Sequence, residues 1–166
     1  MGIAQYTYED VIGYAVLIEQ RGIQLYTDAA KGLKNEPAKN ILLHLAEQER
    51  QHEQYFLMLK DRVKTHDSRK VDMDDQSIGY LAALAESEIF SDDGKPDDQK
   101  FNTLQDVIEF GMQTEKDSIL FYVELSRLNW EDTTIEILQS IIQEEKKHLV
   151  QLAELKQLVE ERDVYY

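Results

Sequence analysis

Apolar residues recur every three or four positions along four stretches of this chain, which is the pattern of helices that bury one face. The pattern predicts helices over about residues 7–33, 37–64, 103–128 and 130–162, and a short helix over about 77–90 within a long connection, 65–102. A connection of this size can return the chain along a bundle helix of about 40 Å, so the third long helix need not run antiparallel to the second. We therefore expect an all-α four-helix bundle of two helical hairpins joined by a long crossover.

Residues that cap helices stand at three of the predicted starts. Thr7 and Thr103 each precede an acidic residue at the third position, Asp10 and Asp106, as in a capping box. Asn35 precedes the second helix, where its side chain can accept a hydrogen bond from a backbone N–H.

The apolar faces of the four long helices are interrupted by polar residues at core positions. Each helix has one glutamate there, and the second and fourth long helices have a histidine three residues after it. The six residues are Glu19, Glu49, His52, Glu115, Glu145 and His148. A carboxylate or imidazole inside a core is costly unless something pairs with it, so these positions are candidates for a functional site.

The polar residues repeat at a constant interval of 96 residues. Glu19, Tyr26, Glu49 and His52 reappear as Glu115, Tyr122, Glu145 and His148, and several apolar core positions follow the same shift. This regularity indicates an internal duplication of a helical hairpin. With turns near residues 35 and 130, the two glutamates of each hairpin stand at nearly equal depth. Stacking the hairpins then brings four carboxylates and two imidazoles to one level of the bundle.

A pair of metal ions would explain such a cluster. Four neighbouring carboxylates repel one another in a core, whereas two divalent cations balance their charge and leave both histidines neutral. Mixed carboxylate and imidazole ligands suit iron or manganese, and zinc is possible. The alternative is a buried salt-bridge network, which is disfavoured because no Lys or Arg lies on the apolar faces.

Composition narrows the class of protein further. The length suits a single domain, residues 1–166, and the net charge of −15 argues against nucleic acid or an anionic membrane as a partner. With no cysteine, the sequence offers no disulfide, thiolate nucleophile, Cys-ligated zinc or iron–sulfur cluster. The first residues do not resemble a signal peptide, and no apolar run approaches the roughly 18 residues of a membrane span. We expect a cytoplasmic protein.

The order of motifs resembles the ferritin-like di-iron carboxylate superfamily: a glutamate, a Glu-x-x-His motif, a long connection, and the same again. The strings EQERQH, TEKDSILFY and QEEKKH are most similar to the rubrerythrin-related branch, and the resemblance spans residues 8–160. It implies a ferritin-like bundle with two iron ions bridged by Glu49 and Glu145. It also implies terminal ligands at Glu19 and Glu115, one histidine ligand for each ion at His52 and His148, and hydrogen bonds from Tyr26 and Tyr122 to carboxylates.

Two features depart from full-length rubrerythrins. Those proteins carry a cysteine-rich rubredoxin iron site that supplies electrons, and this chain has no cysteine. They also have a further glutamate one turn from the ligand on the third helix, where this chain has Met112 and Ser118 beside Glu115. The six-ligand set is therefore closer to the bacterioferritin pattern.

Three functions are compatible with this site. The leading hypothesis is a di-iron oxidoreductase of peroxidase or oxidase type, which reduces hydrogen peroxide or dioxygen with electrons from an external donor. The alternative is a ferroxidase, for which ferrous iron is the substrate and storage or delivery is the purpose. The third is a helical scaffold that holds metal structurally and binds a partner. We also expect a homodimer or a larger homo-oligomer.

Four further residues can be interpreted in more than one way. Glu144 is either solvated or a residue that supports the metal ligands. Tyr26 and Tyr122 could equally be core tyrosines that have no role at the site. His44 lacks a repeat partner, so we predict an exposed or capping residue.

Overall fold

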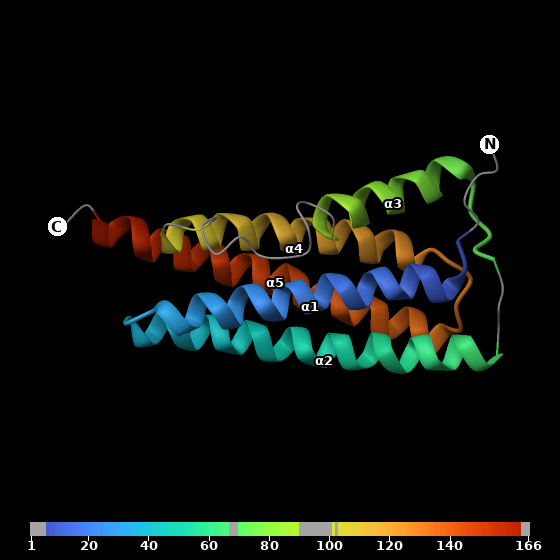
Figure 1. The fold of residues 1–166 in the computed structure, drawn as a ribbon, viewed down its shortest axis with the longest axis horizontal. Coiled ribbons are helices and arrows are strands. Elements are labelled where there is room, and N and C mark those ends of the chain that lie inside the picture. The colour runs from blue at the N-terminus through green and yellow to red at the C-terminus, as the bar shows by residue number, and fades with distance from the viewer. Residues whose placement is uncertain (1–5, 67–69, 90–100, 102, 164–166) are drawn as a thin grey trace.

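A computed structural model describes residues 6–66, 70–89, 101 and 103–163 of the chain. They contain the helices α1 (Tyr8–Gly32), α2 (Glu36–His66), α3 (Asp75–Ile89), α4 (Leu104–Ser126) and α5 (Asp132–Asp163). The four long helices form a bundle, and α3 lies in the connection between its halves (Figure 1). The predicted all-α class, with two hairpins and a short helix in the crossover, is confirmed.

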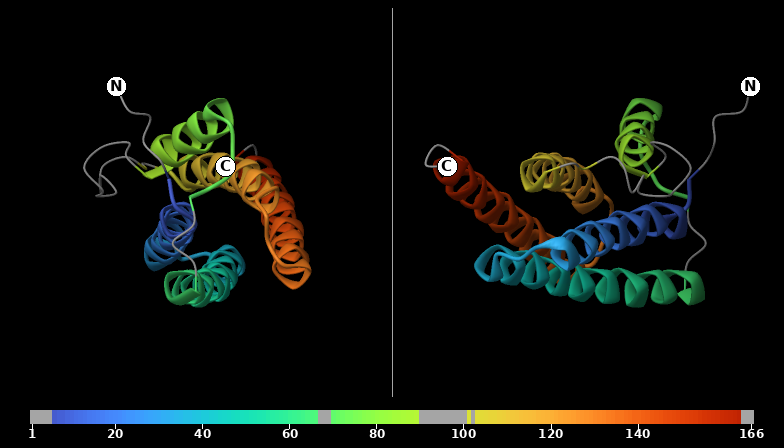
Figure 2. Two further views of the ribbon diagram at one scale, coloured as in Figure 1. Left: turned by 90° about the vertical axis from the view of Figure 1, so that its right-hand side faces the viewer. Right: turned by 60° about the vertical axis from the view of Figure 1, so that its left-hand side comes forward.

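The bundle is assembled from two antiparallel hairpins. α1 packs along α2 and α4 packs along α5, and the hairpins meet where α1 contacts α4 and α2 contacts α5. α2 and α4 run in the same direction, so the chain has to travel back along the bundle between them (Figure 1). α5 is visibly inclined to α2 (Figure 2).

The predicted capping residues begin their helices. In α1 the Asp10 backbone N–H donates to Thr7 Oγ1 at 3.2 Å, and in α4 the Asp106 N–H donates to Thr103 Oγ1 at 3.1 Å, each within a complete capping box. Asn35 Oδ1 accepts from the Ala38 N–H at 3.1 Å at the start of α2. Each contact satisfies a backbone donor that the first turn of a helix leaves unpaired.

The short helix α3 begins two residues before the predicted start. The Asp74 carboxylate accepts a hydrogen bond from the Ser77 backbone N–H at 2.8 Å, and this cap starts the helix at Asp75, ahead of the apolar spacing. Phe90, where the prediction ended the helix, lies outside the described residues.

The last long helix begins at Asp132 rather than 130. Trp130 instead anchors the turn before it, because its indole N–H donates to the Leu125 carbonyl at 2.8 Å and its ring packs edge-on against Tyr8. Helix starts depend on such contacts as well as on apolar spacing, so errors of this size are expected.

The apolar core is divided into two clusters by the polar residues. On each long helix the glutamate lies between residues of one cluster and residues of the other. One cluster includes Ile12, Phe56, Phe121 and Leu138, and the other includes Leu42, Leu45, Ile108 and Leu152, all fully buried. The polar level is therefore enclosed along the bundle axis by closely packed apolar side chains.

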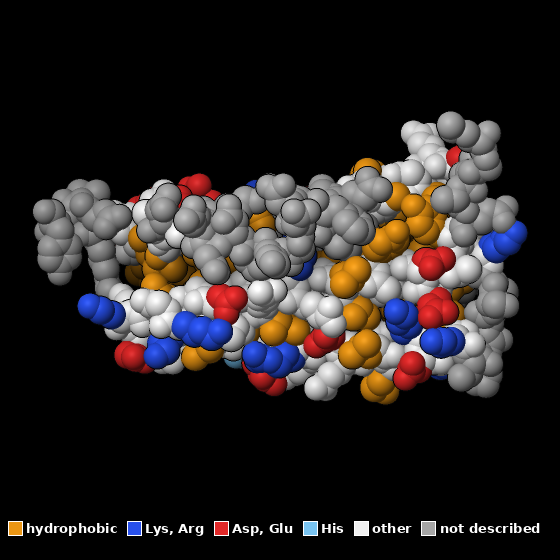
Figure 3. All heavy atoms as spheres, in the orientation of Figure 1, with side chains coloured by type: hydrophobic (Ala, Val, Ile, Leu, Met, Phe, Trp, Pro, Cys, Tyr) orange, Lys and Arg blue, Asp and Glu red, His pale blue; other side chains and the backbone are white. Residues whose placement is uncertain are grey.

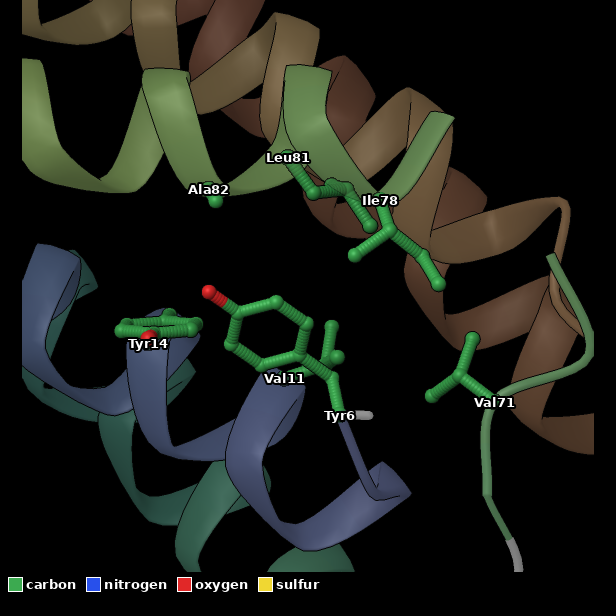
Figure 4. A pocket seen from close by; sticks show the side chains of 7 residues that line it. All are labelled: Tyr6, Val11, Tyr14, Val71, Ile78, Leu81 and Ala82. Carbon is green, nitrogen blue, oxygen red and sulfur yellow. The ribbon is translucent and has the colours of Figure 1, made fainter. Parts of the chain in front are cut away.

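α3 lies along the side of the bundle, where it packs on α1 and α4 (Figure 1). A small apolar pocket of about 10 Å³ between α3 and the start of α1 is lined by Tyr6, Val11, Tyr14, Val71, Ile78, Leu81 and Ala82 (Figure 4). A cavity of this size holds about one water molecule at most. The contact therefore serves packing, and the Val71 N–H reinforces it by donating to the Tyr6 carbonyl at 3.0 Å.

The surface carries both signs of charge side by side on the face shown in Figure 3. Exposed ion pairs among the described residues include Arg50–Glu47 at 3.2 Å and Lys64–Glu9 at 3.7 Å. Pairs of this kind contribute at most about 1 kcal/mol. Every helix in the described part of the chain is too short or too polar to span a membrane.

Candidate metal centre

All four long helices contribute to one buried polar cluster. α1 supplies Glu19 and α4 supplies Glu115, while α2 and α5 each supply a Glu-x-x-His pair. Each of the six residues is at most 4% exposed: Glu19, Glu49, His52, Glu115, Glu145 and His148. Because Glu and His three positions apart project from one helix face, each pair points into the bundle together. The structure thus brings all six predicted residues together.

The cluster contains two groups of metal-ligand atoms. One consists of Glu19, Glu49, His52 and Glu145, and the other of Glu49, Glu115, Glu145 and His148. Within each group the ligand atoms all lie within 4.8 Å of one another. Glu49 and Glu145 belong to both groups, which is the placement required of carboxylates that bridge two metals.

Both histidines direct Nδ1 toward the carboxylates. His52 Nδ1 lies 3.0 Å from Glu145 Oε1, and His148 Nδ1 lies 3.0 Å from both Glu49 Oε1 and Glu145 Oε2. The two imidazole rings are stacked, with centroids 5.8 Å apart. Nδ1 is therefore the nitrogen that each histidine offers to a metal.

Several polar atoms in the cluster lack the hydrogen-bond partners that buried polar atoms normally have. Although the two Nδ1 atoms lie 3.0 Å from carboxylate oxygens, these contacts lack hydrogen-bond geometry. Buried atoms without a hydrogen-bond partner among the described residues include Glu19 Oε2, Glu49 Oε1, His52 Nδ1, His148 Nδ1 and both carboxylate oxygens of Glu145. Unsatisfied buried polar atoms are rare in native proteins and call for an unseen water or ion. These atoms are hard oxygen and imidazole donors, so the set fits divalent iron, manganese or zinc.

The carboxylates of the cluster differ in their acidity. Burial raises the pKa of Glu19 and of Glu115 well above the ordinary value, and the negative charges of Glu49 and Glu145 raise both further. Burial also opposes ionisation of Glu49, but its contacts with Glu19 and the two histidines outweigh burial and lower its pKa. The protonated form of the two outer carboxylates, Glu19 and Glu115, is therefore favoured over the ionised form.

The histidines hold protons as well. Burial disfavours the charged form of His148, but the carboxylates around it, with Glu115 foremost, raise its pKa to about 12. The pKa of His52 is also raised, because Glu145, Glu19 and Glu49 outweigh the effect of burial. Metal binding must displace these protons, since a nitrogen that binds metal cannot keep its proton.

Two buried tyrosines connect the hairpins. The Tyr26 hydroxyl donates a hydrogen bond to Glu115 Oε1, and the Tyr122 hydroxyl donates to Glu19 Oε1. Each tyrosine thus contacts the outer glutamate of the opposite hairpin. Burial and the adjoining carboxylate raise the pKa of both tyrosines, so both hydroxyls remain protonated donors. Each bond leaves the second oxygen of its glutamate turned toward the cluster.

Two glycines that the sequence analysis passed over lie against the site. A Cβ atom at Gly22 would stand 3.2 Å from Glu49 Cγ, and one at Gly111 would stand 3.1 Å from Tyr26 Cε1. Both distances are tighter than ordinary contacts. A glycine on the buried face of a helix could have signalled such close approach.

His44 lies away from the cluster, exposed as predicted. It lines an open groove of about 400 Å³ between α2 and α5, together with Asn40, Ile41, Gln151, Glu154, Leu155 and Leu158.

Glu144 contacts the cluster from outside, since its Oε2 lies 2.7 Å from His52 Nε2. Of the two interpretations of Glu144, the structure thus favours a residue that supports a ligand.

Comparison with known proteins agrees with this geometry. The family model described as rubrerythrin matches residues 10–156. The chain belongs to the rubrerythrin family. A crystal structure of a "putative ferritin-like diiron-carboxylate protein" from Thermotoga maritima is 23% identical, with a TM-score of 0.68, and the alignment covers 92% of this chain and 96% of that one. At this identity the likeness establishes the ferritin-like fold. The search of curated proteins found no match.

In this rubrerythrin-family chain the six candidate ligands lie together in the structure. Met112 packs, half-buried, against the apolar cluster that contains Tyr26, and the Ser118 hydroxyl donates to the Thr114 carbonyl at 2.8 Å. Neither residue offers a carboxylate beside Glu115.

Proposed function

We propose that the protein is a di-iron oxidoreductase that reduces hydrogen peroxide or dioxygen with electrons from an external donor. The observation that carries the proposal is the pair of four-donor groups that share Glu49 and Glu145 at the centre of a buried, apolar-walled level. Two ferrous ions bound there would supply two electrons, the number that converts hydrogen peroxide and two protons into two water molecules.

The chain's own residues have defined tasks in this proposal. Six side chains hold the metals, and Tyr26 and Tyr122 orient the outer glutamates by donating to one oxygen of each. The two apolar clusters exclude water along the bundle axis. The absence of cysteine from the sequence means that the electrons come from a separate donor rather than from a rubredoxin site within this sequence.

The test begins with metal-free protein loaded with ferrous iron under anaerobic conditions. We expect two irons per chain and a near-ultraviolet absorbance change when hydrogen peroxide or dioxygen is added in a stopped-flow instrument. The variant Glu145→Ala should lose the change, whereas His44→Ala, which alters a histidine outside the cluster, should keep it. An iron-loaded protein whose absorbance is unchanged by both oxidants would refute the proposal.

A ferroxidase is a second candidate because the site has six ligands and no further carboxylate at Met112 or Ser118. In that case iron is the substrate and leaves the site after oxidation. Repeated additions of ferrous iron in air distinguish the two functions. Iron that stays at two per chain indicates a cofactor, whereas iron that accumulates in a large assembly, seen by size-exclusion chromatography, indicates storage.

A further inference from the structure

The two candidate ligand histidines differ at the nitrogen that faces away from the cluster. His52 Nε2 lies 2.7 Å from Glu144 Oε2, within hydrogen-bond distance. His148 Nε2 is buried and has no hydrogen-bond partner among the described residues. The inner contacts are alike, since each Nδ1 has a carboxylate oxygen at 3.0 Å. The difference therefore arises behind the ligands and not among them.

The internal repeat shows why only one histidine has such a partner. A shift of 96 residues carries Glu145 back to Glu49 and Glu144 back to Gln48. Gln48 is neutral, and its Oε1 is also buried without a partner among the described residues. Glu144 thus breaks the symmetry of a site whose six ligands and two tyrosines all obey it. The break adds one negative charge on the side of His52.

A carboxylate behind a metal-ligating histidine has known physical effects. It holds the proton on the outer nitrogen, fixes the ring orientation and makes the inner nitrogen a stronger donor. Removing such a partner typically lowers metal affinity about 10- to 100-fold. The Glu144 side chain is 37% exposed, so solvent screens part of its charge, but the hydrogen bond to a 4% exposed imidazole is sheltered.

We propose that Glu144 is a positioning residue that makes the two metal positions unequal. The position formed by Glu19, Glu49, His52 and Glu145 binds metal first and more tightly, and the position that uses Glu115 and His148 fills second. This inference rests on the proposed metal function, because it assigns different affinities to the two halves of the same site.

An anaerobic titration of metal-free protein with cobalt(II) tests the inference, because the visible absorbance of bound cobalt reports each binding step. The wild type should bind two cobalt ions in two steps whose dissociation constants differ at least about 10-fold. Glu144→Gln should weaken the first step by about 10- to 100-fold, so that the steps merge. Glu19→Gln should remove the tight step, and Glu115→Gln the weak one.

Matched variants separate positioning from a general effect on charge or folding. Gln48→Glu places a carboxylate at the equivalent position behind His148 and should tighten the second step. Glu154→Gln removes an exposed charge from the same helix as Glu144 and should leave both steps unchanged. Circular dichroism should show that Glu144→Gln retains the wild-type fold.

The outcomes are distinct. Two equal steps in the wild type, or equal weakening of both steps by Glu144→Gln, would overturn the inference while leaving a two-metal site intact. A wild-type protein that binds no cobalt and no iron would remove the proposed function and this inference together.

Discussion

The two hairpins of the bundle carry the same candidate ligands, but they differ in the residues around the site. Glu19, Tyr26, Glu49 and His52 have counterparts of the same type in the second hairpin. The neighbouring pairs do not match: Ala15 corresponds to Gly111, Gly22 to Ser118, and Gln48 to Glu144. A duplicated site can therefore keep one donor set while its surroundings make the halves unequal. Variants in either hairpin should reveal how far this inequality goes.

The largest effect on metal binding is expected from the two residues that belong to both donor groups, Glu49 and Glu145. Glu49→Ala should abolish binding of both metals, because its carboxylate belongs to both donor groups, and Glu145→Ala should do the same. Glu19→Ala should leave about one metal per chain, because Glu19 belongs to one group. The affinity lost should exceed the roughly 10- to 100-fold typical of residues behind a ligand. Metal analysis after anaerobic gel filtration measures the stoichiometry, and one tight metal retained by Glu49→Ala would contradict the shared position.

The stability of the metal-free protein should depend on pH more strongly than the stability of the metal-loaded protein. The pKa of His148 is raised to about 12 in the folded protein, and the pKa values of His52, Glu19 and Glu115 are raised too. A raised pKa adds stability below the group's ordinary pKa, and this stability is lost as the pH rises toward the folded-state value. The melting temperature of metal-free protein should therefore fall between pH 7 and 9. Bound metal replaces the protons, so the loaded protein should change less across the same range.

Gly111 should be sensitive to a single added methyl group. A Cβ atom there would approach the Tyr26 hydroxyl to 3.2 Å and Leu152 Cδ1 to 3.3 Å. Gly111→Ala should cost about 1–3 kcal/mol of unfolding free energy through overpacking. Gly79→Ala is the matched control, since nothing lies within 4 Å of a Cβ there, and it should gain about 0.5–1 kcal/mol. Urea denaturation measures both, and equal effects would show that the close approach is relieved without cost.

The tyrosine hydroxyls should have similar effects in the two hairpins. Tyr26→Phe and Tyr122→Phe each remove a buried donor to an outer glutamate, which should cost about 1–3 kcal/mol. Tyr80→Phe, at an exposed tyrosine of α3, should be close to neutral. Cobalt titration of the same variants would show whether each tyrosine acts on the metal position of the opposite hairpin. Unequal stability losses would mean that the asymmetry extends to the tyrosines.

Much of the architecture could be predicted from the chain. Helix starts and buried faces depend on residues close together in the sequence, so they could be predicted. Examples are the capping boxes at Thr7 and Thr103 and the regular apolar spacing. The start of α3 could not be placed as well, because Asp74 caps it ahead of the apolar pattern. The two glycines against the site were missed, because the sequence does not say what lies opposite a helix face.

The polar level of the bundle could be predicted from the sequence. One glutamate stands on the buried face of each of the four long helices, and the 96-residue repeat places these glutamates at matching depths. The partners of those side chains were decided by tertiary structure. Three of these contacts join residues from different hairpins: Tyr26 with Glu115, Tyr122 with Glu19, and His52 with Glu144. Such contacts depend on how two hairpins are placed to within an ångström or two, and helical periodicity fixes only which face of each helix is turned inward.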